Sequence, residues 1–470
     1  MINRRKFLKM GGAGLGAAAG FASNLASFNA YAADTSGYKA LVCVFLRGGL
    51  DGHDTVIPYD VNSSRAYEAI RESIIDLYAS EGNESRRRNN LLRLHGRSGN
   101  GFLSDGREFG VAKECRALHE LYQDGKMAVV GNIGPLVEPI NRAAFQSGSA
   151  DLPPRLFSHN DQQSFWMASS PEGATEGWGG GFGDRISHVN RMASFASVST
   201  AGNQVFTNGR NTNTFNLSTV GGLNVYGLES ESFLGSDAFA QAYRHNIYGN
   251  TSDHVDFVGR DIVNLTGRAV DNNKIVRDAL SASAGITTRF PSTSLGDQLK
   301  IVASMIASRN ILGMRRQIFF VADTGYDTHS NQAATLPKRQ IELSEAMAAF
   351  YKETEAMGVE NDVTSFTASD FGRSLIPNST GTDHGWGSHH FVLGGAVNGG
   401  RIFGNIPQAE IGHDQDAGRG RLIPELSVDQ YANALGRFYG LTLDERKEVL
   451  PNLSNFDVEA LYGLFFDEFV

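Results

Sequence analysis

Three apolar runs of strand length occur along the chain, and each leads into an aspartate. Residues 41–46, 317–322 and 363–369 are almost continuously apolar or small. Runs of this kind are typical of parallel strands that are buried on both faces of a sheet. The aspartates that follow them are Asp51, Asp323 with Asp327, and Asp370.

Amphipathic segments of helical length precede the second and third runs. Residues 295–312 lead into one strand and residues 339–357 into the other, and this repeated order favours parallel pairing with right-handed crossovers. The pattern therefore predicts an α/β protein. Further strands are predicted over 127–133 and 390–397, and further helices over 64–77, 111–123, 161–168, 428–439 and 456–465.

Two stretches depart from this alternation. Glycines recur between residues 177 and 183 and predict a flexible or closely packed loop around Trp178. From residue 194 the composition shifts toward Asn, Ser, Thr and Gly while Phe and Val recur, which predicts a β-rich insertion or cap over about residues 194–290. We expect the rest of residues 33–470 to form a single domain.

The first 32 residues have the pattern of an export signal rather than of a folded segment. Arg4 and Arg5 precede a short, weakly apolar stretch, and Ala30-Tyr31-Ala32 offers a cleavage site before Ala33. The arginine pair predicts export by the twin-arginine translocase to the periplasm or beyond; the alternative is an ordinary secretory signal with a chance arginine pair. No later segment approaches the length of about 20 apolar residues that a stable membrane anchor needs.

Composition excludes some classes of function. The 470 residues carry a net charge of −9 without a basic patch, so nucleic acid is not an expected partner. Cys43 and Cys115 are the two cysteines, which excludes a disulfide scaffold and leaves one disulfide open.

Acidic and imidazole side chains after the strands predict a metal site. Asp323, Asp327 and His329 follow one strand, and the motif between Gly381 and His390 contains three histidines, of which His384 and His390 are preferred as ligands. Carboxylates and imidazoles at such positions can bind zinc or manganese, although a helix-capping aspartate is the simpler alternative for Asp323.

Three residues are candidates for the reaction itself. Ser158, at the start of a predicted helix, is either a cap or a nucleophile. Arg47 and Arg373 could each hold an anion, and Arg373 could instead pair with Asp370. The Gly-x-Ser-x-Gly turn of an ordinary serine hydrolase is absent from the sequence.

Together these motifs resemble an exported bacterial family catalogued as domain of unknown function 1501. The resemblance rests on Arg47-Gly-Gly-Leu-Asp51-Gly, Asp327-Thr-His329 with Gln332, Ser369-Asp370-Phe-Gly-Arg373, and Gly381 to His390, and it covers the whole mature chain. The family resembles a branch of the alkaline phosphatase and sulfatase superfamily. This implies a doubly wound, mostly parallel sheet flanked by helices, with one or two divalent ions (zinc, or manganese or calcium) at strand ends.

By the same resemblance, Asp51 and Asp370 would bind one metal. Asp327 or Asp323, His329 and a histidine between His384 and His390 would bind the other. The chain departs from the superfamily at Phe371, where a histidine is usual, and Asp151 replaces the first residue of the sulfatase Cys/Ser-x-Pro-x-Arg motif.

The sequence thus predicts an exported, metal-dependent hydrolase of small phosphate or sulfate esters. The main alternative is a non-catalytic periplasmic binding or assembly protein that keeps the phosphatase-like fold. A cofactor-bearing oxidoreductase is suggested by the export route alone.

Overall fold

The computed structural model describes residues 33–96, 103, 105–219, 232–249, 257–283 and 285–466. The predicted export signal, residues 1–32, lies outside the described residues.

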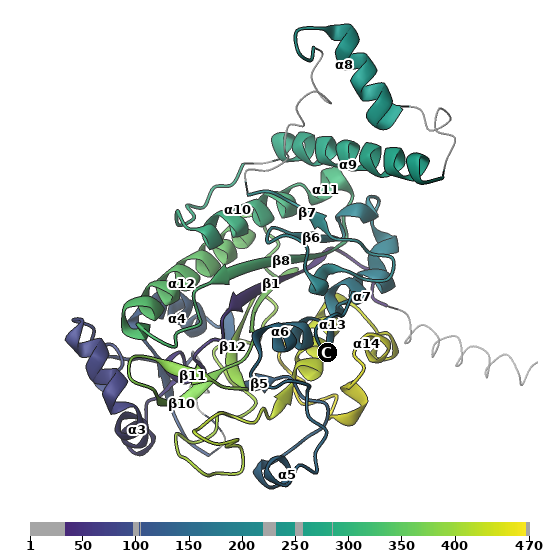
Figure 1. The fold of residues 1–470 in the computed structure, drawn as a ribbon. Helices are drawn as coiled ribbons and strands as arrows, with labels where there is room; N and C mark the ends of the chain where they lie inside the picture. The colour runs from purple at the N-terminus through teal and green to yellow at the C-terminus, as the bar shows by residue number, and fades with distance from the viewer. Residues whose placement is uncertain are drawn as a thin grey trace, which may run out of the picture.

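A mixed, mostly parallel sheet runs through the centre of the protein (Figure 1). Within the described residues it has nine strands in the order β13-β5-β12-β9-β1-β8-β6-β7, and β14 also pairs with β5. The strands are β1 (Lys39–Arg47), β5 (Met127–Gly134), β6 (Ser197–Ser199), β7 (Phe215–Asn216), β8 (Arg316–Thr324), β9 (Val363–Ser369), β12 (Ser388–Leu393), β13 (Ile402–Phe403) and β14 (Leu426–Ser427).

The three apolar runs form the middle of this sheet, as the sequence predicted. β1 pairs in parallel with both β8 and β9. Leu46 lies opposite Asp323 on one side and Ser369 on the other, so the carboxyl ends of the three strands are level. The loops that carry the predicted site residues therefore leave the sheet at one edge.

β12 gives the sheet its mixed character, because it pairs antiparallel with β9 and with β5. It follows β9 after a short antiparallel hairpin formed by β10 (Arg373–Pro377) and β11 (Thr382–His384). Parallel pairing needs a long crossover connection that brings the chain back to the edge where the previous strand began. The short hairpin does not provide one, so β12 runs antiparallel to β9. A small separate sheet contains β2 (Ile57–Pro58), β3 (Leu92–Arg93) and β4 (Phe109–Val111).

Helices cover both faces of the sheet, and alternate residues of β1 enter two separate apolar cores. Val42 and Val44 contribute to a core with α4, α10 and α12, whereas Cys43 and Phe45 contribute to a core with α7 and α13 (Figure 1). The helices are α3 (Val61–Ser80), α4 (Arg116–Gln123), α5 (Arg142–Ser147), α6 (His159–Ala168), α7 (Trp178–Ile186), α8 (Asp237–Arg244), α9 (Phe257–Ala282), α10 (Ser294–Ala307), α11 (Arg309–Leu312), α12 (Gln332–Ala356), α13 (Val428–Tyr439) and α14 (Leu443–Val449). Burial on both faces explains why the central strands lack apolar–polar alternation.

The glycine-rich segment around Trp178 is helix α7 rather than a loop. A Cβ on Gly180 would lie 2.0 Å from the carbonyl carbon of Asn208, and one on Gly179 would lie 2.7 Å from the carbonyl oxygen of Phe206. The glycines therefore allow the helix backbone to pack directly against the segment around Phe206. Close packing was the correct part of the sequence prediction.

The predicted terminal helix over 456–465 was wrong, because this segment forms turns. The side chain of Asp457 accepts a hydrogen bond from the backbone N–H of Glu459 at 2.9 Å, which favours a turn over a continued helix.

The predicted insertion is β-rich only at its start. β6 and β7 extend the main sheet, whereas the later described part contains α8 and α9 (Figure 1). In α9, Val263 and Val270 are buried at helical spacing and account for the helix.

Cys43 and Cys115 are both buried free thiols, so they do not form the disulfide that the sequence left open. None of the helices in the described part of the chain is long and apolar enough to cross a membrane.

Candidate metal centre

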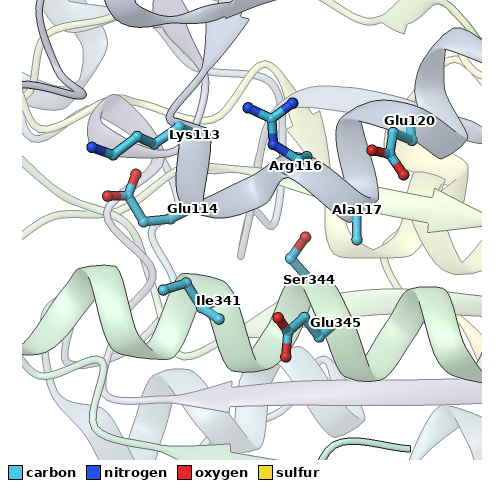
Figure 2. Close-up of a pocket in the computed structure, with 8 residues that line it drawn as sticks. All are labelled: Lys113, Glu114, Arg116, Ala117, Glu120, Ile341, Ser344 and Glu345. Carbon is cyan, nitrogen blue, oxygen red and sulfur yellow. The ribbon is translucent and has the colours of Figure 1, made fainter. Parts of the chain in front are cut away.

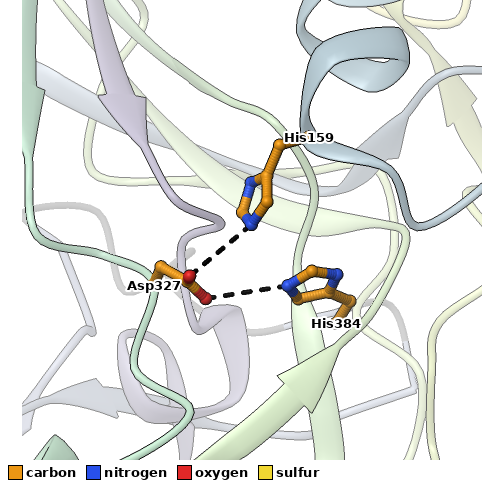
Figure 3. Close-up of side chains that lie close together, drawn as sticks. All are labelled: His159, Asp327 and His384. Carbon is orange, nitrogen blue, oxygen red and sulfur yellow. Dashed lines mark ion pairs between the residues drawn. The ribbon is translucent and has the colours of Figure 1, made fainter.

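Two histidines and an aspartate from three separate elements converge at the carboxyl edge of the sheet. His159 is the first residue of α6, Asp327 lies in the loop after β8, and His384 ends β11 (Figure 3). One ligand atom from each lies within 4.8 Å of the other two. Such a group of nitrogen and oxygen donors fits a divalent transition metal.

His159 is oriented by a buried carboxylate. Its Nδ1 lies 2.6 Å from Oδ2 of Asp370, and its Nε2 lies 3.6 Å from Oδ2 of Asp327. An ionised carboxylate can only accept, so Nδ1 donates the proton of this hydrogen bond. The Asp370 hydrogen bond raises the pKa of His159 above its ordinary value, against the effect of partial burial.

His384 is oriented by a backbone carbonyl instead. Its Nδ1 donates to the carbonyl oxygen of Phe157 at 2.8 Å. Its Nε2 is buried, has no hydrogen-bond partner and lies 3.6 Å from Oδ1 of Asp327. Burial lowers the pKa of His384, so its imidazole is neutral at pH 7 and carries a lone pair on Nε2.

The carboxylate of Asp327 is held by Arg373. Nη1 of Arg373 donates to Oδ1 of Asp327 at 2.9 Å, and the same guanidinium donates to the carbonyl oxygens of Gly48 and Thr382 at 3.0 and 2.5 Å. Although burial opposes ionisation, Arg373 lowers the pKa of Asp327 below its ordinary value. The β10–β11 hairpin pairs Arg373 with His384, which places both side chains beside Asp327.

His329 adds a third imidazole at the exposed side of this group. Its Nε2 lies 3.5 Å from Oδ1 of Asp327, its Nδ1 lies 3.7 Å from Oδ1 of Asp383, and its ring centre is 4.5 Å from that of His384. The structure therefore places Asp327, His329 and His384, three of the predicted metal ligands, beside His159, which was not among them.

His159 was missed because only Ser158 was considered at the start of that helix. Spacing in the sequence does not connect residue 159 with the strand-end motifs. The available signal was an imidazole just before the helix predicted over 161–168.

Asp370, predicted as a metal ligand, contacts the group through His159. Its Oδ2 also accepts hydrogen bonds from Nε2 of Gln163 at 2.9 Å and from the backbone N–H of Gly48 at 3.2 Å. Its Oδ1 is buried without a hydrogen-bond partner. A carboxylate that accepts the proton of an imidazole in this way is typical of histidines that bind metal ions in proteins.

Asp51, the other predicted ligand after β1, is engaged in a buried ion pair with Arg71. Arg71 of α3 donates to its two carboxylate oxygens at 3.1 and 2.6 Å, and Gln332 of α12 donates to Oδ2 at 2.7 Å. Gln332 also accepts a hydrogen bond from the hydroxyl of Thr382 at 2.8 Å. Asp51 is thus linked to the site through Gln332 and Thr382 and is not itself part of it.

Asp323 and His390 are also not brought into the group. Asp323 is inside β8, where Tyr326 donates to it at 3.1 Å and Arg339 lies 3.6 Å away. His390 is buried in β12 with its ring centre 4.9 Å from that of Trp166, and burial lowers its pKa to about 3.

The three residues considered for the reaction make contacts within the protein. The hydroxyl of Ser158 donates to Asp161 at 2.9 Å, and Arg47 donates to Gln204 at 2.9 Å. Arg373 is buried and engages Asp327, as described above.

Phe371 closes one side of the group. Its ring centre lies 4.7 Å from that of His159 and 4.5 Å from that of His384. The residue that replaces the expected histidine therefore packs against both imidazoles instead of offering a further ligand.

A separate pocket between α4 and α12 has a volume of about 390 Å³ and shares no residue with this group (Figure 2). Glu114 lies at its edge, but its carboxylate is engaged by Arg86 at 3.0 Å. The other charged side chains around it are Lys113, Arg116, Glu120 and Glu345. The charged side chains point in different directions and do not converge on a common point (Figure 2).

The sequence model of the family described as "Protein of unknown function (DUF1501)" matches residues 38–419. No curated protein matches the chain in sequence.

Two solved structures illustrate the likeness found in three dimensions. Ps i-CgsB in complex with k-i-k-neocarrahexaose has 9% identity and a TM-score of 0.35, over 90% of this chain and 78% of that chain. The PsFucS1 sulfatase from Pseudoalteromonas sp. has 9% identity and a TM-score of 0.34, over 91% of this chain and 72% of that chain.

Proposed function

Since the chain belongs to the DUF1501 family, to which no function is attached, we propose one from its site: it binds a divalent transition metal ion through His159, Asp327 and His384. We further propose that the bound ion serves the hydrolysis of a small phosphate or sulfate ester. His329 is positioned to join as a fourth ligand or to contact the substrate.

One observation carries the proposal: both imidazoles present Nε2 toward the same carboxylate. Asp370 fixes the proton of His159 on Nδ1, and the Phe157 carbonyl does so for His384. Histidines that bind metals are typically held in this way by an acceptor behind the ring. The unpartnered Nε2 of His384 is costly to bury unless it has a ligand, which fits an ion at this position.

Neighbouring residues and burial keep the proposed ligands in the charge states that bind a cation. Arg373 keeps Asp327 ionised and fixed in orientation, and burial keeps His384 neutral. The remaining carboxylate oxygen, Oδ2, faces Nε2 of His159. The chemistry that a bound divalent ion supplies is polarisation of an ester oxygen and acidification of a bound water.

The proposed ligand side chains are partly exposed to solvent, which suits the binding of a small substrate. The side chains of Asp327, His159 and His384 remain 48%, 30% and 24% exposed. A substrate can therefore reach them without a large rearrangement, and water can leave as it binds.

Export by the twin-arginine route remains part of the proposal. It rests on Arg4-Arg5 and the Ala-x-Ala site of the sequence. A fusion of residues 1–32 to a reporter, with Arg4 and Arg5 both replaced by Lys as the matched control, tests it by fractionation. Export that is unaffected by the replacement would contradict this route.

Metal binding is tested by zinc and manganese titration of the purified mature protein. We expect one ion per chain, with affinity reduced at least about 10- to 100-fold in His159→Ala and His384→Ala. His188→Ala is a matched control, because His188 is exposed and precedes Asn190, which hydrogen-bonds the start of β8 at the opposite edge of the sheet. Wild-type protein without a bound ion, or equal affinity in all variants, would refute the metal site.

A second function is favoured by one specific observation. Ser158 and Arg373, the candidates for attack and for anion binding, are both engaged within the protein. We therefore keep a non-catalytic binding protein as the alternative. A panel of aryl phosphates, phosphodiesters and aryl sulfates, assayed with added zinc, manganese or calcium, separates the two, since the binding protein turns over none of them.

A further inference from the structure

The loop before α6 contains two large residues in the left-handed backbone region. Phe157 has a φ of 71° and Arg155 has a φ of 50°. Side chains other than Gly, Asn and Asp rarely adopt this conformation. Such conformations persist where the surroundings impose them, and they concentrate at functional sites.

Contacts on several sides impose the conformation of Phe157. The backbone N–H of Ser158 donates to the carbonyl oxygen of Arg155 at 3.1 Å, which closes the turn. The ring of Phe157 packs at the edge of an apolar cluster that contains Trp386 and lies 4.6 Å from the guanidinium of Arg421. These contacts fix the position of the Phe157 side chain, and they thereby hold the Phe157 backbone at a positive φ.

The result of this geometry is a carbonyl that points at His384. Its oxygen accepts the Nδ1 proton of His384 at 2.8 Å. We propose that Phe157 is a positioning residue, whose left-handed backbone directs its carbonyl at His384 and so selects the tautomer that leaves a lone pair on Nε2.

This role of Phe157 rests on the proposed metal site, and it explains how the tautomer of one ligand, His384, is selected. Nε2 of His384 is the atom that faces Asp327. A proton on Nε2 instead would abolish its capacity to bind a metal ion. Rotation of φ into the ordinary negative region would turn the Phe157 carbonyl away from the imidazole, and both tautomers would then be populated.

The tautomer can be measured directly in the metal-free mature protein. Imidazole ¹⁵N shifts, with His384 assigned through His384→Gln, should show the proton on Nδ1 in the wild type. Phe157→Asn tolerates a positive φ and should keep this tautomer. Phe157→Pro, with φ fixed near −65°, should lose the preference, and Phe157→Val supplies a milder test should the proline variant not fold.

Cobalt binding gives an independent readout of the same variants. We expect affinity within a few-fold of the wild type for Phe157→Asn and about 10- to 100-fold weaker for Phe157→Pro or Phe157→Val. An Nδ1 proton that persists in a folded proline or valine variant would overturn the proposal, as would an Nε2 proton in the wild type. Wild-type protein that shows the expected tautomers but binds no cobalt would refute the metal site and leave the relation between Phe157 and His384 standing.

Discussion

Oδ2 of Asp370 lies 2.6 Å from Nδ1 of His159, so a strand-end carboxylate orients the imidazole that faces Asp327. The pair connects β9 to the first turn of α6, two elements that are far apart in the sequence.

Replacement of Asp370 by Asn should lower the pKa of His159, because a neutral amide does not stabilise the imidazolium ion as the carboxylate does. NMR titration of His159 measures this shift. Because the pKa of His159 is higher in the folded protein than in the unfolded chain, its contribution to stability is complete below the unfolded value of about 6.5. This contribution is lost as the pH rises through the folded-state pKa. The metal-free variant should therefore be destabilised most at pH 6 and below. Asp383→Asn is the control, since Asp383 faces His329; an equal shift of His159 in the control would contradict the assignment.

Replacement of Asp51 by Asn should destabilise the protein by about 3–5 kcal/mol, because it leaves the buried guanidinium of Arg71 without its counter-ion. Urea denaturation measures the loss. Asp362→Asn is the control: its ion pair with Lys39 is partly exposed and should contribute less than about 1 kcal/mol. The folded Asp51→Asn protein should still bind one metal ion per chain, whereas loss of the ion without loss of stability would make Asp51 a ligand.

Acid should destabilise the fold well before the carboxylates titrate. Burial lowers the pKa of His53 to about 4 and those of His389 and His390 to about 3, so the folded protein keeps these imidazoles neutral. Because these histidines bind protons more readily in the unfolded chain, the fold has its full stability above the ordinary pKa of about 6.5. The free energy of unfolding then falls as the pH decreases toward the folded-state pKa values. At pH 5.5 each of these histidines should lower the free energy of unfolding by about 1.4 kcal/mol. Denaturation midpoints between pH 7.5 and 5 test this, and His390→Gln should flatten the slope while the exposed His188→Gln should not.

Replacement of Gly180 by Ala should destabilise the protein by at least about 1–3 kcal/mol, since the new methyl group would meet the backbone of Asn208. Gly285→Ala is the matched control, because a Cβ there meets nothing within 4 Å. Thermal unfolding compares the two. Equal melting temperatures would show that α7 can move away from the segment around Phe206 at little cost.

The central strands could be predicted from the sequence because burial on both faces makes them continuously apolar. Their level carboxyl ends followed from parallel pairing, and Asp327, His329 and His384 were found for that reason. Helix α7 could not be predicted, because glycines indicate a loop unless the close approach of another backbone is known.

Three side chains of the candidate group were among the predicted metal ligands, and His159 was not. His159 reaches Asp327 only because α6 docks at the sheet edge, and local sequence does not encode that docking. Asp51 resembles a ligand until its partner Arg71 is seen, because the charge that neutralises it lies on a different element. Strand-end motifs therefore indicate where a site is, while tertiary contacts decide which acids face it.

The guanidinium of Arg373 already occupies one oxygen of Asp327, so the carboxylate has a permanent counter-charge of its own. The charge of Asp327 is thus neutralised before the proposed ion binds, so the chain can fold without the ion. A chelator should then strip the proposed ion without unfolding the chain.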